Sequence, residues 1–124
     1  MFCLTMEPNH FKFINEIGYK PVGLGENSFD KGWFTDKDGE NISQKNNYYG
    51  EYTYHYWLWK NYLDQIDDGW IGFCQYRKFW SMQDHANESI NFSNINNKVL
   101  KHIPDDFNKY ETILGKPIFI NQFK

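Results

Sequence analysis

Four consecutive hydrogen-bonding side chains, Gln75 to Lys78, follow a nearly continuous apolar run. Ligands of open α/β sheets bind beyond the carboxyl ends of the strands, and this segment is predicted to lie at such an end. The planar fork of Arg77 suits paired phosphate oxygens and Lys78 adds a point charge, so the two side chains can neutralise a diphosphate. The alternative, which the local sequence by itself favours, is that Arg77 pairs with an acidic neighbour such as Glu51 and only positions a helix.

A second group that bears on a diphosphate is an Asp-x-Asp pair, Asp36 and Asp38. Such a pair can hold a divalent cation, Mn²⁺ or Mg²⁺, against phosphate oxygens. The spacing does not fit a calcium-binding loop, in which glycine stands at the sixth position, because Gly39 follows Asp38 directly. An isolated Asp-x-Asp-Gly is usually a turn, so a turn is the first prediction and a cation the alternative, and no metal ligand is assigned.

Glu51 and His55 are separated by four residues, so on a helix they share one face. They would then orient each other or a substrate hydroxyl, although a helical histidine among tyrosines is more often a core residue. The chain has no G-x-S-x-G motif, and "GLGENS" lacks the dinucleotide-binding fingerprint. No residue is therefore predicted as a nucleophile or a catalytic base.

The elements that position these groups begin with an apolar run, Phe2 to Thr5, which predicts a buried strand. A helix is predicted next, with Pro8 in its first turn and Gly18 as its stop, and a second strand follows over residues 19–24. Strand, helix and strand in this order predict an α/β sheet with flanking helices. Thr5 ends the first strand, so it is a candidate binding residue.

The rest of the chain continues this pattern. A long polar loop is predicted over residues 25–47, and its length makes it a place to look for chemistry. A mostly buried helix is predicted over residues 49–62 and a central strand over residues 70–74. After a polar surface excursion, a short helix is predicted over residues 94–102 and a strand over residues 112–120.

Composition limits the possible classes of protein. At 124 residues the chain is expected to form a single domain, 1–124, and its 40% hydrophobic and 23% charged residues are ordinary for a soluble protein. A net charge of −3 without a basic stripe argues against nucleic-acid binding. Cys3 and Cys74 have no CxxC context and suggest reduced thiols. Without a signal peptide or an apolar run long enough for a transmembrane segment, we expect a cytoplasmic protein.

The aromatic fraction, 20%, is unusually high. Tyr and Trp combine a large apolar body with a polar group, which suits carbohydrate and nucleotide sites, but the same rings also build hydrophobic cores. For any single ring the two interpretations stay open.

Four linked segments add a resemblance: "PVGLGEN", "DKDGENISQKN", "YYGEYTYHYWLWKN" and "WIGFCQYRKFW". Their order and spacing, over Pro21 to Trp80, resemble a bacterial domain-of-unknown-function family found in capsular polysaccharide, exopolysaccharide and lipopolysaccharide synthesis proteins. That family carries Pro-x-Gly-x-Gly, Asp-x-x-Gly-Asp-Asn-Ile-Ser-x-Lys-Asn, Glu-Leu-Thr-x-x-Tyr-Trp-x-Trp-Lys-Asn and His-Tyr-Arg-Arg motifs. The later segment "YETILGKPI" looks like the strand that follows.

The resemblance implies a glycosyltransferase with a GT-A-like, Rossmann-like mixed sheet that binds a nucleotide sugar and transfers the sugar to a glycan acceptor. It adds residues of the loop motif to the candidates found above. The full set of candidate substrate-binding residues is Thr5, Asp36, Asp38, Asn41, Ser43, Lys45, Asn46, Glu51, His55, Gln75, Tyr76, Arg77 and Lys78.

Three positions depart from the family pattern. Gln75 stands where the family has histidine, Lys78 where it has arginine, and Glu40 where it has aspartate. Gln75 cannot act as an acid or a base, and Lys78 keeps the charge but loses the fork. These departures keep a non-catalytic nucleotide-sugar or carbohydrate-binding module open as the alternative function.

The resemblance also bears on completeness, because the family domain is longer than this chain. We therefore expect a fold that is incomplete at its C-terminal end and that corresponds to the donor-binding part of a longer glycosyltransferase domain. A sheet with an exposed edge would favour oligomers, or a partner chain that completes the fold.

Overall fold

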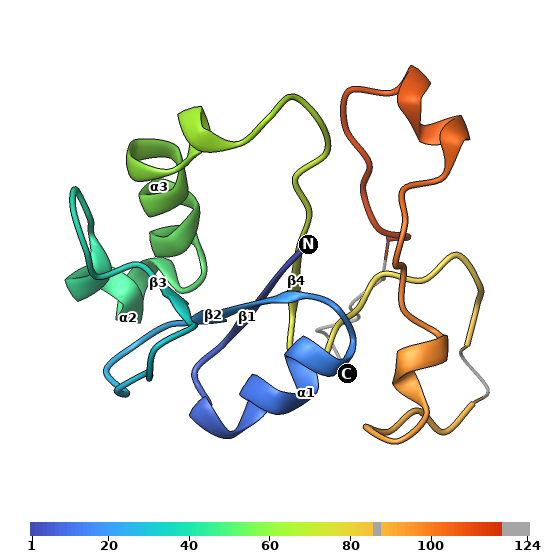
Figure 1. Cartoon of the computed structure of the whole chain (residues 1–124), viewed down its shortest axis with the longest axis horizontal. Helices are drawn as coiled ribbons and strands as arrows, with labels where there is room; N and C mark the ends of the chain where they lie inside the picture. Colours follow the sequence, from blue (N-terminus) through green and yellow to red (C-terminus); the bar gives the residue numbers. More distant parts are fainter. Residues whose placement is uncertain (86–87, 118–124) are drawn as a thin grey trace, which may run out of the picture.

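The computed structural model describes residues 1–85 and 88–117, and it confirms the α/β class (Figure 1). A four-stranded sheet has the order β3-β2-β1-β4, and the pairings of β1 with β2, β1 with β4, and β2 with β3 are all parallel. Gln75 and Lys78 add one isolated antiparallel bridge. The strands are β1 (Phe2–Thr5), β2 (Lys20–Gly23), β3 (Phe34–Thr35) and β4 (Phe73–Gln75).

The register of the sheet brings the carboxyl ends of all four strands to one edge. Thr5 lies opposite Gly23, and Gly23 lies opposite Thr35. On the other side of β1, Leu4 lies opposite Gln75. The chain therefore adds β2 and β3 on one side of β1 and then returns to place β4 on the other, so the order of the strands reverses between β1 and β4.

The predicted first helix is confirmed as a 3₁₀ turn, Pro8–His10, that continues into α1 (Phe11–Glu16). Gly18 ends it with a φ of 80°, a left-handed conformation that glycine adopts without strain. The predicted second strand is β2. Strand, helix and strand thus follow one another as the apolar spacing predicts.

The predicted long loop and the helix after it are more subdivided than expected. The loop contains β3, a 3₁₀ turn, Ser43–Lys45, and a single helical turn, α2 (Asn46–Tyr49). Gly50, with a φ of 53°, separates α2 from α3 (Tyr52–Asn61). The two-residue β3 was missed because so short a strand has no alternation to read.

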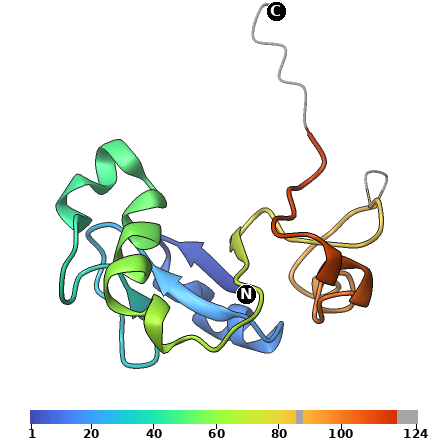
Figure 2. The same cartoon turned by 90° about the horizontal axis from the view of Figure 1, so that it is seen from above.

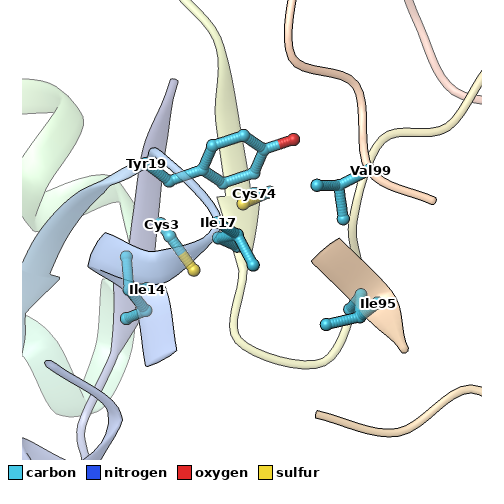
Figure 3. Close-up of a cluster of buried hydrophobic side chains, with 7 residues drawn as sticks. All are labelled: Cys3, Ile14, Ile17, Tyr19, Cys74, Ile95 and Val99. Atoms are coloured by element: carbon cyan, nitrogen blue, oxygen red, sulfur yellow. The ribbon is translucent and has the colours of Figure 1, made fainter. Parts of the chain in front are cut away.

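Two hydrophobic cores cover the two faces of the sheet. The strand β1 contributes to both, because successive side chains of a strand point to opposite faces. The core on the α1 face, shown in Figure 3, contains Cys3, Ile14, Ile17, Tyr19, Cys74, Ile95 and Val99. The core on the α3 face contains Phe2, Leu4, Val22, Leu24, Tyr54 and Leu58.

The prediction that the aromatic helix is mostly buried was wrong. Only Thr53, Tyr54 and Leu58 of α3 are buried. Tyr52 is 66% exposed and Trp59 is 59% exposed. Since six of its ten residues carry rings, the sequence does not reveal which of them face the sheet.

The apolar strand before the polar segment is shorter than predicted, and it lies at the end of the sheet order instead of its centre. Its outer side is covered in part by the chain that follows, since the indole Nε1 of Trp80 donates to the Phe73 carbonyl at 2.7 Å. The Trp80 carbonyl in turn accepts from the Leu100 amide at 2.7 Å. This cover explains why the strand has the apolar character of a buried one.

The two cysteines lie opposite each other on β1 and β4 as free, buried thiols. Contact with Cys3, together with burial, raises the pKa of the Cys74 thiol far above its ordinary value. Thiolate is the reactive form of cysteine, so Cys74 is a packing residue at neutral pH.

Residues 81–85 and 88–117 lie beside β4 and contain little regular structure (Figure 1). The predicted helix over residues 94–102 is one 3₁₀ turn, Ile95–Asn97. The predicted strand over residues 112–120 is absent from residues 112–117, and its remainder lies outside the described residues. Two further 3₁₀ segments are Leu63–Gln65 and Asp105–Lys109.

Among residues 1–85 and 88–117, no helix has the length and apolar character needed to span a membrane.

Two buried tyrosines offer a matched test of this packing. Burial raises the pKa of both phenols. The Tyr19 hydroxyl donates to the Leu100 carbonyl at 2.7 Å, whereas the Tyr54 hydroxyl has no hydrogen-bond partner in the described part of the chain. We expect Tyr54→Phe to raise the free energy of unfolding by about 1 kcal/mol and Tyr19→Phe to lower it by about 1 kcal/mol. Urea unfolding measures both, and a loss of stability in Tyr54→Phe would show that its hydroxyl is hydrogen-bonded in solution.

Candidate functional site

The reversal of strand order between β1 and β4 marks the place where a ligand is expected in an open α/β sheet. Three strand ends bring candidate residues to this edge: Thr5 ends β1, Gln75 ends β4, and Asp36 follows β3. Neighbouring strands lie about 4.8 Å apart, so β3 and β4, three spacings apart, are separated by roughly 14 Å. The candidate residues therefore form two groups, one at the β1–β4 end of the edge and one at the β3 end.

On the α1 side of the β1–β4 end, three side chains form a connected row. The Thr5 hydroxyl lies 2.9 Å from His10 Nδ1 and accepts from the Glu7 amide at 3.0 Å. The His10 ring stacks on the Tyr76 ring, with centroids 4.8 Å apart. When Nδ1 accepts from the threonine hydroxyl, Nε2 carries the proton and is a donor.

His10 was missed in the sequence. Its only signal there is its place in the turn that directly follows the first strand, and nothing local indicates that its ring meets Tyr76, 66 positions later along the chain. Contact between β1 and β4 creates that pair.

A tight turn presents the cationic residues. The Lys78 amide donates to the Gln75 carbonyl at 3.0 Å, and the Gln75 amide donates to the Lys78 carbonyl at 3.3 Å, so Tyr76 and Arg77 occupy the tip. The Arg77 guanidinium lies 5.5 Å from the centre of the Tyr76 ring, a cation–π distance. Arg77 and Lys78 are both exposed, and neither forms an ion pair within residues 1–85 and 88–117.

The alternative pairing of Arg77 with Glu51 does not form. Glu51 precedes α3 and its Oε2 accepts a hydrogen bond from the Gln75 side-chain amide instead. This bond ties the end of β4 to the beginning of α3. Arg77 consequently keeps its charge available, while Gln75 and Glu51 satisfy each other.

His55 is a packed side chain on this face. Its ring meets Phe73 edge-on at 4.3 Å and Tyr52 at 5.5 Å, and its buried Nε2 has no hydrogen-bond partner among the described residues. Burial lowers the pKa of His55, and the charge of Glu51 opposes that shift in part. The two side chains share a helix face as predicted, but the core interpretation of His55 fits its surroundings better than a role with substrate.

The loop after β3 is organised by its own polar side chains. Asn41 accepts at Oδ1 from the Ser43 amide at 3.2 Å and from the Ser43 hydroxyl at 2.8 Å. Its Nδ2 donates to the Lys37 and Gly39 carbonyls at 2.9 and 3.0 Å. Asn41 and Ser43 therefore stabilise the turn. This structural role accounts for an asparagine and a serine at these positions, and no bound ligand is needed to explain them.

The helix α3 holds this loop in place, mainly through Glu40. Asn61 accepts from the Glu40 amide at 3.0 Å and donates to the Glu40 carbonyl at 2.8 Å. The Glu40 carboxylate accepts from the Tyr56 hydroxyl at 2.7 Å and lies 3.4 Å from Lys60 Nζ. The Trp57 indole also donates to the Asp38 carbonyl at 2.7 Å. The polar groups of α3 thus hold the loop against the helix by hydrogen bonds.

Asn46 connects the loop to the sheet. Its Nδ2 donates to the Gly50 carbonyl at 2.9 Å and to the Thr53 hydroxyl at 3.1 Å. Its Oδ1 lies 3.8 Å from the position that a Cβ on Gly25 would occupy, and Gly25 follows the end of β2. Asn46 therefore lies at the same edge, between the two groups of candidates. Lys45, in the turn before it, is exposed.

The two aspartates of the loop lie in different surroundings. Asp36 is fully buried, and neither of its carboxylate oxygens has a hydrogen-bond partner in the described part of the chain. Asp38 is exposed. Within residues 1–85 and 88–117, no three His, Cys, Asp or Glu residues converge to hold a metal ion. The described residues therefore offer no metal site made of protein ligands alone, and a cation held between the two aspartates and phosphate oxygens stays a prediction.

Comparison with known proteins places the chain in a family. A family model described as "Domain of unknown function (DUF4422)" matches residues 3–123. The chain belongs to the DUF4422 family. The match contains β2, β3, β4, all of β1 except Phe2, the loop and the Gln75–Lys78 turn. No curated protein and no solved structure matches the chain.

The buried state of His55 gives this DUF4422 protein a testable pH dependence. Because the pKa of His55 is lower in the folded chain than in the unfolded one, the unfolded chain takes up the proton first as the pH falls. The contribution of His55 is complete above about pH 6.5 and is lost as the pH falls below that value. We expect the wild-type protein to lose more stability between about pH 7 and pH 5 than His55→Leu, as measured by urea unfolding. Equal losses would show that the pKa of His55 is not lowered in the folded chain.

Proposed function

We propose that this DUF4422 protein is glycosyltransferase-like, acts in surface-polysaccharide biosynthesis, and binds a nucleotide sugar at the carboxyl edge of its sheet. The observation that carries the proposal is the Gln75–Lys78 turn at the reversal of strand order, whose Arg77 has no ion pair within residues 1–85 and 88–117. The four motifs that resemble polysaccharide-synthesis proteins support the biological context.

The diphosphate is assigned to the turn. Arg77 offers a planar fork of donors, and Lys78 adds a second positive charge next to it. The cation–π contact with Tyr76 restricts where the guanidinium can lie, which lowers the entropy lost when it binds an anion. An exposed arginine without an ion pair retains its binding capacity for a ligand.

The neutral polar residues at the same edge of the sheet are assigned to bind the hydroxyl groups of the nucleotide sugar. Thr5 and His10 lie on one side of the turn, and Asn46 lies toward the end of β2. Because the edge runs from β4 to β3, an elongated ligand lying along it reaches both groups of candidates. A nucleotide sugar, with a diphosphate between two hydroxyl-rich parts, has this shape and chemistry.

In the proposed transfer, the bond between the anomeric carbon and the diphosphate oxygen breaks, and its electron pair goes to the diphosphate. Arg77 and Lys78 would stabilise the negative charge that develops there. The acceptor hydroxyl forms the new bond to the anomeric carbon, and its proton goes to water. No described residue is assigned to receive that proton, since Gln75 cannot and Glu51 is engaged by Gln75.

A non-catalytic binding module is the second candidate function, and the Glu51–Gln75 hydrogen bond favours it. That bond occupies the carboxylate of Glu51, while an amide, Gln75, stands where the resembling family has a histidine. Turnover distinguishes the candidates: release of nucleoside diphosphate in the presence of acceptor supports the enzyme, and binding without release supports the module.

The first test concerns the arginine. We expect Arg77→Ala to weaken binding of uridine diphosphate about tenfold to a hundredfold, because it removes charge-assisted hydrogen bonds to the diphosphate. Arg77→Lys keeps the charge but loses the fork, so it should give an intermediate loss. Isothermal titration calorimetry measures all three proteins, and circular dichroism verifies that they are folded.

The control for charge is Lys109→Ala, which removes one positive charge from the 3₁₀ segment Asp105–Lys109. It should leave the affinity unchanged. We also expect the wild-type affinity to persist in EDTA, because the positive charge in the proposed site comes from side chains. Equal affinity of Arg77→Ala and the wild-type protein would refute the assignment, and binding that requires Mn²⁺ would move the diphosphate toward Asp36 and Asp38.

A further inference from the structure

A cleft of about 1280 Å³ lies next to the proposed donor site, and no role has yet been assigned to it. Its lining comes from the chain that leaves β4, from residues 81–85 and from residues between 90 and 99, and the last of these segments lies on the right in Figures 1 and 2. Tyr76 and Arg77 belong to its lining. The cleft is therefore continuous with the turn to which the diphosphate is assigned.

Aromatic rings form one wall of the cleft. Tyr76, Phe79 and Phe92 line it, and rings of the α1 segment link them. His10 stacks on Tyr76 at 4.8 Å and meets Phe92 at 6.0 Å. Phe13 meets Phe92 at 4.4 Å and Phe79 edge-on at 5.8 Å. The wall thus rests on a helix, and the same rings contact the Thr5–His10 pair.

Most of the apolar surface of Phe92 is not buried by the rest of the chain. It remains 61% exposed, although its ring is held against Phe13 and His10. A fixed ring with an open face is available for stacking. The exposed ring of Phe92 can therefore stack on a molecule that enters the cleft.

Charged and hydrogen-bonding groups lie in the same cleft. Arg77 is exposed at one end, and Lys98, which pairs with Glu88, lines the cleft as well. Ser81 and Gln83 add a hydroxyl and an amide. A purely apolar ligand would remove these groups from water at a cost, so a ligand with both an apolar face and several hydroxyl groups fits better.

We propose that this cleft binds a pyranose ring of the acceptor glycan, with the carbon–hydrogen face of the sugar on Phe92 and its hydroxyl groups toward the polar lining. This inference rests on the proposed function, and it places donor and acceptor on the two sides of the Gln75–Lys78 turn. The volume exceeds that of common small-molecule pockets, roughly 300 to 1,000 Å³, so the cleft can hold more than one sugar ring.

The test uses simple probes: the methyl glycosides of glucopyranose, galactopyranose, mannopyranose and N-acetylglucosamine, with uridine as the nucleobase probe. Saturation-transfer difference NMR should show contact with at least one methyl pyranoside, strongest at the protons on one face of its ring. Phe92→Ala should weaken that binding about tenfold, since a stacked ring is removed.

The matched control is Tyr110→Ala, which removes a 51% exposed ring that does not line the cleft, and it should leave the pyranoside signal unchanged. The inference is overturned if no pyranoside shows saturation transfer, if Phe92→Ala binds as well as the wild-type protein, or if uridine displaces the pyranoside from the cleft.

Titration of Phe92→Ala with uridine diphosphate separates this inference from the proposed function. Retained diphosphate affinity with lost pyranoside binding supports both. Diphosphate binding without any pyranoside binding overturns the acceptor site alone. Pyranoside binding that depends on Phe92, without diphosphate binding, supports the sugar site and refutes the donor site on which its acceptor role rests.

Discussion

The position of β1 between two parallel neighbours is the constraint on which the rest of this structure depends. Phe2–Thr5 pairs with β2 on one side and with β4 on the other, so its backbone is satisfied from both directions. Such a strand must be covered on both faces, and α1 and α3 provide that cover. The same pairing aligns Thr5 with the residues beyond β4, and without it the polar edge would not exist.

The helix α3 has a second role that its composition does not make obvious. Three of its side chains are buried, and the others hold the chain around it. Asn61, Tyr56 and Lys60 all reach Glu40, and the hydroxyl of Tyr56 is the main reason that the pKa of Glu40 is lowered. A helix that packs through one narrow face can carry polar groups on its other faces, and these groups hold residues 36–42, which have no helix or strand of their own.

The abundance of aromatic residues has more than one physical cause. Phe2 and Tyr54 fill the core on the α3 face, where their rings are in contact. Trp57 and Trp80 use their indole groups as hydrogen-bond donors to backbone carbonyls at the boundary of the packed region. Tyr76 and Phe92 line an open cleft. Rings are suited to all three tasks because each combines a large apolar surface with a fixed shape.

The sequence by itself determined the local elements of this protein. The apolar run of β1, the helical spacing of α1 and the stop at Gly18 depend on neighbours in the chain, and each was predicted correctly. The placement of polar residues at the end of β4 was also readable, because an apolar run that turns polar marks where burial ends.

Only the tertiary structure decided which strands pair and which side chains from distant parts of the chain come into contact. It placed β4 beside β1, stacked His10 on Tyr76 and joined Glu51 to Gln75 by a hydrogen bond. It also left Arg77 without an ion pair to any residue that the structure describes. It also decided that β4 ends the sheet order with Trp80 against it, and which rings of α3 face the core. The physical reason is that periodicity and turn chemistry are local properties of a chain. Strand order and side-chain partners depend instead on contacts between residues far apart in the sequence, and many arrangements of them satisfy the same local pattern.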